Sequence, residues 1–265
     1  MFGRVRVRRD RRARVSGALL AVGATVASLA PIAAVTPTAG AAPEIVSFET
    51  RAKDGTALRG HVFLPAGGVP AGTVLQLSPY WNTVKGPAEL QGDSEAVRPF
   101  LDAGFAVALV NLRGTGESDG CFQWGSPLDW SDAATVVTAL AAEPWSNGNV
   151  GMYGTSYEAW SQFMAMADPP PALKAAVPIS GVIDLWSLLT RRGAPISVGP
   201  AAALVFGTGT SFAGLETAVA GHAGCGDFAT HLRQGAELVT TGDRTRYYAQ
   251  RDLRPFLEDS RVPVL

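Results

Sequence analysis

The chain has 265 residues, of which 47% are hydrophobic and 17% charged, and its formal net charge is −1. This composition is typical of a globular protein with a large core and excludes a disordered chain. Residues 1–41 contain seven arginines and Asp10, so the remainder has 15 basic and 22 acidic residues and a charge of −7. A remainder this acidic, without a basic stripe, argues against nucleic acid as a partner.

The first 41 residues have the pattern of a secretory signal peptide. The arginines precede an uncharged run over residues 15–35, and Ala39-Gly40-Ala41 fits the small-x-small pattern of a cleavage site. This predicts a secreted or cell-envelope protein that starts near Ala42 and meets the membrane only during export. A membrane anchor is the alternative, because the run is near spanning length, although it is weakly hydrophobic. Arg11-Arg12 leaves the export pathway open.

Strand-like and helix-like patterns alternate after residue 42. Asp54-Gly55 separates two β-like runs and predicts a hairpin. Unbroken apolar runs indicate buried strands, and Ser131 can cap a helix with one apolar face. The expected elements are strands 44–51, 58–64, 73–77, 105–110 and 173–179, a strand leading into residue 156, and helices 94–103, from 131, and 157–167. This order predicts an α/β fold with a mostly parallel sheet and helical crossovers.

The pattern changes after residue 181. Residues 182–250 show no clear strand and favour a helical cap inserted into the core. Residues 251–258 resemble a helix, and Arg261–Leu265 reads as the start of a further core strand, where the chain stops. The expected organisation is therefore a signal peptide (1–41), the first part of the core (42–181), a cap (182–250), and a return to the core truncated before the last strands (251–265).

Ser156 is the strongest candidate nucleophile. It follows a short apolar strand, precedes a helix, and has Gly154 two residues before it. This is the arrangement of a nucleophile elbow, in which a strained turn projects the hydroxyl. Glu158 occupies the position of the second glycine in G-x-S-x-G, where a longer side chain is tolerable if it points to solvent. An ordinary glycine turn is the alternative.

Four motifs in order identify a family that the chain resembles. They are Ser78-Pro79-Tyr80, Arg113-Gly114-Thr115-Gly116, Pro144-Trp145-Ser146-Asn147-Gly148 and Gly154-Thr155-Ser156-Tyr157. Over residues 44–265 the chain resembles the Xaa-Pro dipeptidyl-peptidase and cocaine-esterase family of serine hydrolases. The resemblance implies an α/β-hydrolase core with a helical cap, and small peptides or esters as substrates. It also implies that Ser156 is the nucleophile and that the Tyr157 N–H and the Tyr80 hydroxyl form the oxyanion hole.

Several further residues have weaker assignments. Asp184 and Trp186 could line the acyl pocket or simply begin a cap helix. Cys121 and Cys225 are the only cysteines, and an oxidising compartment favours a disulfide between them over two separate thiols. The sequence shows no Cys/His cluster for a metal and implies no dissociable cofactor.

The catalytic base is the missing part of this interpretation. In this fold the acid and the histidine follow the serine, and we expect them after the strand that begins at Val262. The three histidines are His61, His222 and His231, and a pair of His222 with Asp227 has no fold-based reason to reach Ser156. The chain as printed is therefore expected to be poorly soluble and nearly inert.

Three functional readings follow. The leading one is an exported serine hydrolase of the Xaa-Pro dipeptidyl-peptidase type. The alternatives are a carboxylesterase or acylase of the cocaine-esterase type and a non-catalytic hydrolase-like fragment. The oligomeric state stays open.

Overall fold

The computed structural model describes residues 42–67, 69–82, 85–191, 194–195 and 243–265. The predicted signal peptide and most of the predicted cap lie outside these residues, and so do Cys225, His222, Asp227 and His231. Within the described part of the chain, none of the helices has the length and apolar character needed to cross a membrane.

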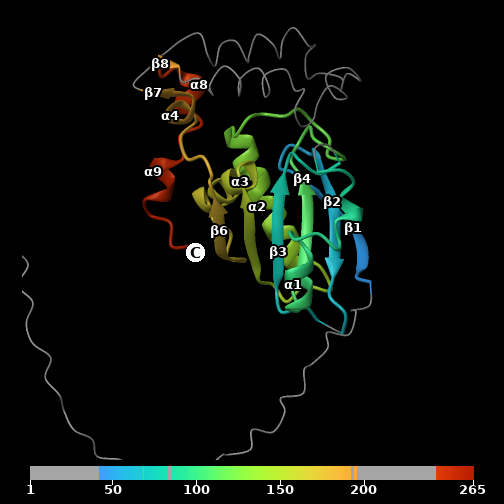
Figure 1. Ribbon diagram of the computed structural model, residues 1–265. Helices are drawn as coiled ribbons and strands as arrows, with labels where there is room; N and C mark the ends of the chain where they lie inside the picture. The colour runs from blue at the N-terminus through green and yellow to red at the C-terminus, as the bar shows by residue number, and fades with distance from the viewer. Residues whose placement is uncertain (1–41, 68, 83–84, 192–193, 196–242) are drawn as a thin grey trace, which may run out of the picture. The chain divides into compact units, whose positions relative to one another are not determined.

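A six-stranded mixed sheet forms the core of the described residues (Figure 1), with the strand order β1-β2-β4-β3-β5-β6. Its strands are β1 (Glu44–Arg51), β2 (Ala57–Leu64), β3 (Thr73–Ser78), β4 (Ala106–Asn111), β5 (Val150–Thr155) and β6 (Leu173–Ile179). β2 pairs antiparallel with β1 and β4, whereas β4, β3, β5 and β6 are parallel to one another. The mostly parallel sheet and the strand predictions are confirmed.

The Asp54-Gly55 hairpin is also confirmed. Arg51 pairs with Ala57 across the turn, and Gly55 takes a φ of 87°. Glycine populates this left-handed region without the steric penalty that a side chain causes. The turn places Asp54 beside the loop that follows β4, with which it forms an ion pair described below.

Two of the three predicted helices of the core begin at other residues than their sequence patterns predict. The helix expected over 94–103 is reduced to α1 (Arg98–Asp102), since Pro99 favours the first helical turn and turns precede it. The helix expected from Ser131 is α2 (Pro127–Ala142), and its N-cap is Ser126. Ser126 and Asp129 form a capping box there, a stronger start signal than a serine inside the helix. Helix α3 (Tyr157–Ala167) has the predicted bounds.

The two faces of the sheet contribute to different hydrophobic clusters. In β4, Ala106, Ala108 and Val110 belong to a large core cluster that contains buried residues of α2 and α3. The alternate residues Val107 and Leu109 belong to a smaller cluster with Trp81 and residues near α1. Because successive strand residues point to opposite faces, the sheet is covered on both sides, and α3 packs against β3, β5 and β6.

Several short elements lie outside the six-stranded sheet. They are η1 (Ala88–Leu90) between β3 and α1, and, after β6, α4 (Leu185–Leu189), β7 (Thr190–Arg191), β8 (Ala194–Pro195), α8 (Arg246–Ala249) and α9 (Arg254–Leu257). The helix expected over 251–258 is reduced to α9, which begins at Arg254 with Pro255 in its first turn. Val264 makes a parallel bridge to Ala176 of β6, so strand pairing does begin near Val262.

Candidate active site

Ser156 joins β5 to α3 in a strained backbone conformation. Its φ is 64° and its ψ is −116°, a combination that residues with side chains rarely adopt. Two hydrogen bonds hold the turn: the Ser156 N–H donates to the Ile179 carbonyl at 3.0 Å, and its carbonyl accepts from the Trp160 N–H at 3.1 Å. The sharp strand-to-helix turn predicted for Ser156 is therefore present at the carboxyl edge of the sheet.

The turn accommodates Glu158 in another way than through a solvent-facing side chain. Its side chain does not point to solvent, because Glu158 is only 3% exposed. One carboxylate oxygen accepts a hydrogen bond from the Thr155 N–H at 3.2 Å, and the other accepts one from Lys85 Nζ at 2.5 Å. The carboxylate also lies in the first turn of α3, where a negative charge is favourable. The buried side chain of Glu158 thus stabilises the turn at Ser156 from its inner side.

Gly154 is required by this packing. A Cβ added to Gly154 would lie 2.4 Å from the Cβ of Glu158 and 2.6 Å from its Oε2. These separations are far below contact distance. Gly154 is the first glycine of G-x-S-x-G, and Glu158 occupies the position of the second. The buried side chain of Glu158 therefore explains why residue 154 is a glycine.

Lys85 places a positive charge near Ser156. Its ammonium lies 5.6 Å from the centre of the Tyr80 ring and 4.5 Å from the centre of the Trp81 ring, within the range of cation–π attraction. Together with its bond to Glu158, this fixes the segment after β3 against the start of α3. Neither Lys85 nor Glu158 was predicted as a site residue.

Tyr80 lies where the family resemblance requires it. Its hydroxyl donates to Ser156 Oγ at 3.2 Å and accepts from the Tyr157 N–H at 3.3 Å. The two donors expected to form an oxyanion hole thus converge beside the serine hydroxyl. Their geometry allows an oxygen placed between them to accept from both.

Burial keeps the phenols of the site protonated. Burial raises the pKa of Tyr80, although its hydrogen bonds to Ser156 and Tyr157 oppose the rise. The pKa of Tyr157 is raised well above its usual value by burial and next by the charge of Asp129. Tyr80 therefore remains a hydrogen-bond donor across the neutral pH range.

Ser156 opens onto a cleft of about 380 Å³. The described residues that line the cleft come from β3, from the segment after it and from the elbow, and they include Tyr80, Lys85, Glu95, Ser156 and Glu158. The size is in the range of small-molecule sites. The lining combines aromatic rings with charged groups near Ser156.

Asp184 and Trp186 are not among the described residues that line this cleft. Asp184 is the N-cap of α4, where it accepts from the Trp186 N–H at 3.2 Å and from the Ser187 hydroxyl at 2.5 Å. It also pairs with Arg254 at 2.9 Å. These contacts explain Asp184 as the start of a helix, and a pocket role for either residue stays a prediction.

The Arg113 loop follows β4, as expected, and its arginine is structural. Arg113 is 4% exposed and donates to both oxygens of Asp132 at 2.6 and 2.7 Å and to Asp54 at 2.8 Å. Burial alone would lower the pKa of Arg113, but these hydrogen bonds raise it above its usual value. The pKa of Asp54 is lowered, chiefly by its hydrogen bond from Arg113.

The described residues bring no imidazole to Ser156. His61 is the one histidine among them, and its Nε2 faces Glu117 and Glu89 instead. Cys121 is disulfide-bonded; because its predicted partner Cys225 lies outside the described residues, the Cys121–Cys225 pairing stays a prediction.

Comparisons with known proteins agree with this architecture. A profile described as X-Pro dipeptidyl-peptidase (S15 family) matches residues 54–265. A putative Xaa-Pro dipeptidyl-peptidase of Streptomyces avermitilis is 31% identical over 112 residues, which cover 37% of this chain and 17% of that protein. A cocaine esterase of Rhodococcus sp. is 28% identical over 141 residues, covering 51% of this chain and 23% of that protein.

A solved structure supports the fold. The CocE/NonD family hydrolase SACOL2612 of Staphylococcus aureus superposes with a TM-score of 0.60 at 21% identity, covering 79% of this chain and 38% of that one. The matched part thus spans less than a quarter of the length of these two relatives and less than half of the solved chain.

Proposed function

Because the chain belongs to the X-Pro dipeptidyl-peptidase family S15, we propose that it is an exported serine hydrolase of the Xaa-Pro dipeptidyl-peptidase type that cleaves through Ser156. The observation that carries the proposal is the convergence of the Tyr80 hydroxyl and the Tyr157 N–H beside Ser156 Oγ, at 3.2 Å from Tyr80 Oη to Ser156 and 3.3 Å from Tyr80 Oη to the Tyr157 nitrogen.

The chemistry follows from these positions. Ser156 Oγ attacks the carbonyl carbon, its proton passes to a general base, and the carbonyl oxygen becomes negatively charged. Tyr80 and the Tyr157 N–H stabilise that oxygen, and each such donor contributes about 3 to 4 kcal/mol. The amine or alcohol then leaves with a proton, and water hydrolyses the acyl-enzyme. In this proposal the general base would be an imidazole, as in Ser-His-Asp enzymes, and the described residues do not supply it.

Substrate class is tested with three chromogenic compounds. Alanyl-prolyl-p-nitroanilide offers a free ammonium and a proline, its N-acetylated form lacks the ammonium, and p-nitrophenyl butyrate lacks both. The native gene product is expected to cleave the first, with the second at least about tenfold slower, since a dipeptidyl-peptidase must bind the substrate ammonium with carboxylates. Ser156→Ala is the control for every substrate.

The alternative is a carboxylesterase or acylase of the cocaine-esterase type, which the Rhodococcus relative favours. It predicts fast turnover of the butyrate ester and no preference for the free ammonium. Failure to cleave any of the three compounds, with a folded protein, would support the non-catalytic reading and contradict both enzymatic ones.

Export is a separate part of the proposal. It is supported by the arginine-rich start and the apolar run before Ala41. Mass spectrometry of the protein recovered from the culture medium or the cell envelope should find an N-terminus near Ala42. Recovery of an intact Met1 form from the cytosol alone would contradict it.

A further inference from the structure

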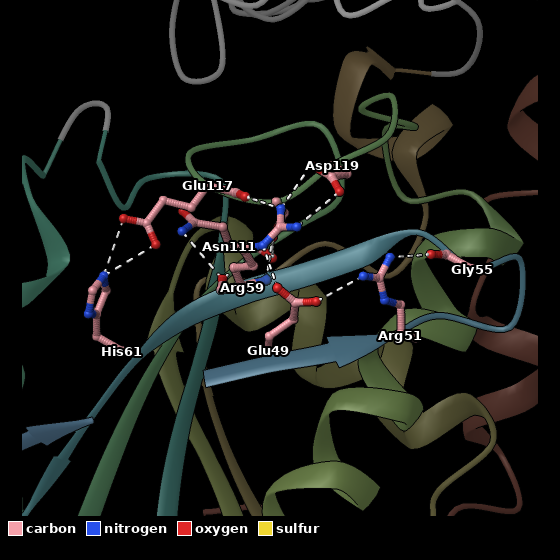
Figure 2. A network of polar contacts seen from close by, with 9 residues as sticks. Glu49, Arg51, Gly55, Arg59, His61, Asn111, Glu117 and Asp119 are labelled. Carbon is pink, nitrogen blue, oxygen red and sulfur yellow. Dashed lines mark hydrogen bonds and ion pairs between the residues drawn. The ribbon is translucent and has the colours of Figure 1, made fainter. Parts of the chain in front are cut away.

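His61, Glu89 and Glu117 come from three separate segments and meet at one point. His61 lies on β2, Glu89 in η1, and Glu117 in the loop after β4. One ligand atom from each lies within 4.8 Å of the other two. Figure 2 shows the imidazole of His61 facing the carboxylate of Glu117. The residues are far apart in the sequence, so no motif reveals them.

The separations fit a metal-ligand set. Both carboxylate oxygens of Glu117 lie 3.3 Å from His61 Nε2, and the nearer oxygen of Glu89 lies 3.7 Å from it. Two ligands at about 2.0 to 2.1 Å from a tetrahedral Zn²⁺ are separated by about 3.3 to 3.4 Å. The Glu89 oxygen lies farther from His61 Nε2 than this separation, so the exposed Glu89 side chain must move closer when a metal binds.

The charge of the cluster also favours a cation. Among the ion pairs of the described residues, Glu89 and Glu117 have no lysine or arginine partner. The nearby Arg59 is already paired with Glu49 at 2.8 Å and Asp119 at 2.8 Å. Arg59 also donates to the backbone carbonyl of Glu117 at 2.9 Å, which holds that loop in place without neutralising its carboxylate.

We propose that His61, Glu89 and Glu117 form a binding site for a divalent transition-metal cation, with Zn²⁺ as the best match. One imidazole and two carboxylates form a mixed donor set that suits Zn²⁺ better than Ca²⁺ or Mg²⁺, which prefer oxygen ligands alone. Three protein ligands leave a fourth position for water. The site is distinct from the Ser156 cleft, whose described lining contains none of the three.

The site would fasten the segment that carries Tyr80 to the sheet. Glu89 and Tyr80 both lie in the connection between β3 and α1, whereas His61 and Glu117 belong to β2 and to the loop after β4. A metal bound to the folded chain alone stabilises it in proportion to its occupancy. The expected role is therefore structural, and it acts on the segment that supplies one oxyanion donor.

Zinc binding to the chelator-treated chain tests the proposal. Equilibrium dialysis with ZnCl2 is compared for the wild type, His61→Phe, Glu89→Gln and Glu117→Gln. The matched control is Glu49→Gln, which removes a neighbouring carboxylate that does not touch His61. Co²⁺ provides a second readout, because its visible absorption intensifies in a tetrahedral site.

The wild type and Glu49→Gln should each bind about one equivalent of zinc. His61→Phe and Glu117→Gln should bind zinc at least tenfold more weakly. A loss of this size is at least as large as the loss known for residues that only support a metal site. Zinc should raise the Tm of the wild type and not that of Glu117→Gln. Equal binding by all variants, or no zinc retained by the wild type, would overturn the proposal. If His61→Phe does not fold, Glu117→Gln, on an exposed loop, gives the deciding result.

Discussion

At the scale of single residues, Tyr80 connects the geometry of the turn at Ser156 with the proposed stabilisation of an oxyanion. Its hydroxyl touches both Ser156 Oγ and the Tyr157 N–H. Before substrate binds, these polar groups satisfy one another, and a developing oxyanion would take the place between the two donors. The site is thus organised before the reaction, which is the condition under which such donors are most effective.

Tyr80→Phe is expected to lower kcat by about 10²- to 10³-fold, because it removes one oxyanion donor and keeps the ring. KM should change much less, since the donor acts mainly in the transition state. Steady-state kinetics on the preferred substrate measure both values. A change in KM alone would show that Tyr80 only contacts the bound substrate.

Ser156, Tyr80 and Tyr157 could be singled out from the sequence because each belongs to a local motif. The charged partners could not. Lys85 and Glu158 are 73 residues apart, and only the tertiary structure brings them together. The burial of Glu158 could not be predicted for the same reason: nothing near it in the sequence indicates the ammonium that makes this burial tolerable.

At the scale of elements, the β5–Ser156–α3 turn depends on the absence of a side chain at residue 154. Gly154→Ala should destabilise the protein and displace Ser156, because the new Cβ meets Glu158 at 2.4 Å. The expected result is a lower Tm together with loss of activity. Both are measured on the same preparation.

Gly148→Ala is the matched control. Gly148 also has a positive φ, 82°, but an added Cβ there meets nothing within 4 Å. It should cost about 1 kcal/mol or slightly more through backbone strain, without loss of activity. If the two substitutions have equal effects, backbone strain and not contact with Glu158 explains the need for glycine at residue 154.

The first turn of α2 contains a buried acid that makes stability depend on pH. Burial, and next the charge of Asp132, raise the pKa of Asp129 to about 7. A raised carboxyl pKa means that the folded state holds its proton more tightly than the unfolded chain does. The contribution of Asp129 to the free energy of unfolding is therefore fully present below about pH 4 and is lost as the pH rises to about 7.

Asp129→Asn should remove this dependence, because the amide stays neutral and can still accept from the Ser126 N–H. Urea unfolding at several pH values should give a wild-type free energy that falls relative to the variant between about pH 4 and pH 7, by up to about 1.4 kcal/mol per pH unit. A constant difference between the two proteins across that window would contradict the raised pKa.

For the whole described core, the Arg113 network joins segments that are distant in sequence. Asp54 belongs to the β1–β2 turn, Arg113 to the loop after β4, and Asp132 to α2. The strands themselves were predictable, since their apolar runs and turns are local signals. The network was not, because Asp132 has no sequence feature that marks its distant partner. The true start of α2 does have a local signal, the capping box of Ser126 and Asp129.

Asp132→Ala is expected to cost about 3 to 5 kcal/mol in the free energy of unfolding, because it leaves the buried guanidinium of Arg113 without its bidentate partner. Asp102→Ala is the control. It removes an exposed helical ion pair with Arg98 and should cost less than about 1 kcal/mol. Similar losses in the two variants, measured by urea unfolding, would contradict a structural role for Arg113.

The central claim is that Ser156 is the nucleophile, and fluorophosphonate labelling of the native gene product tests it most directly. Mass spectrometry should find the adduct on the peptide that contains Ser156, with no adduct in Ser156→Ala and slower labelling in Tyr80→Phe. Labelling of another residue, or labelling that survives Ser156→Ala, would contradict the account.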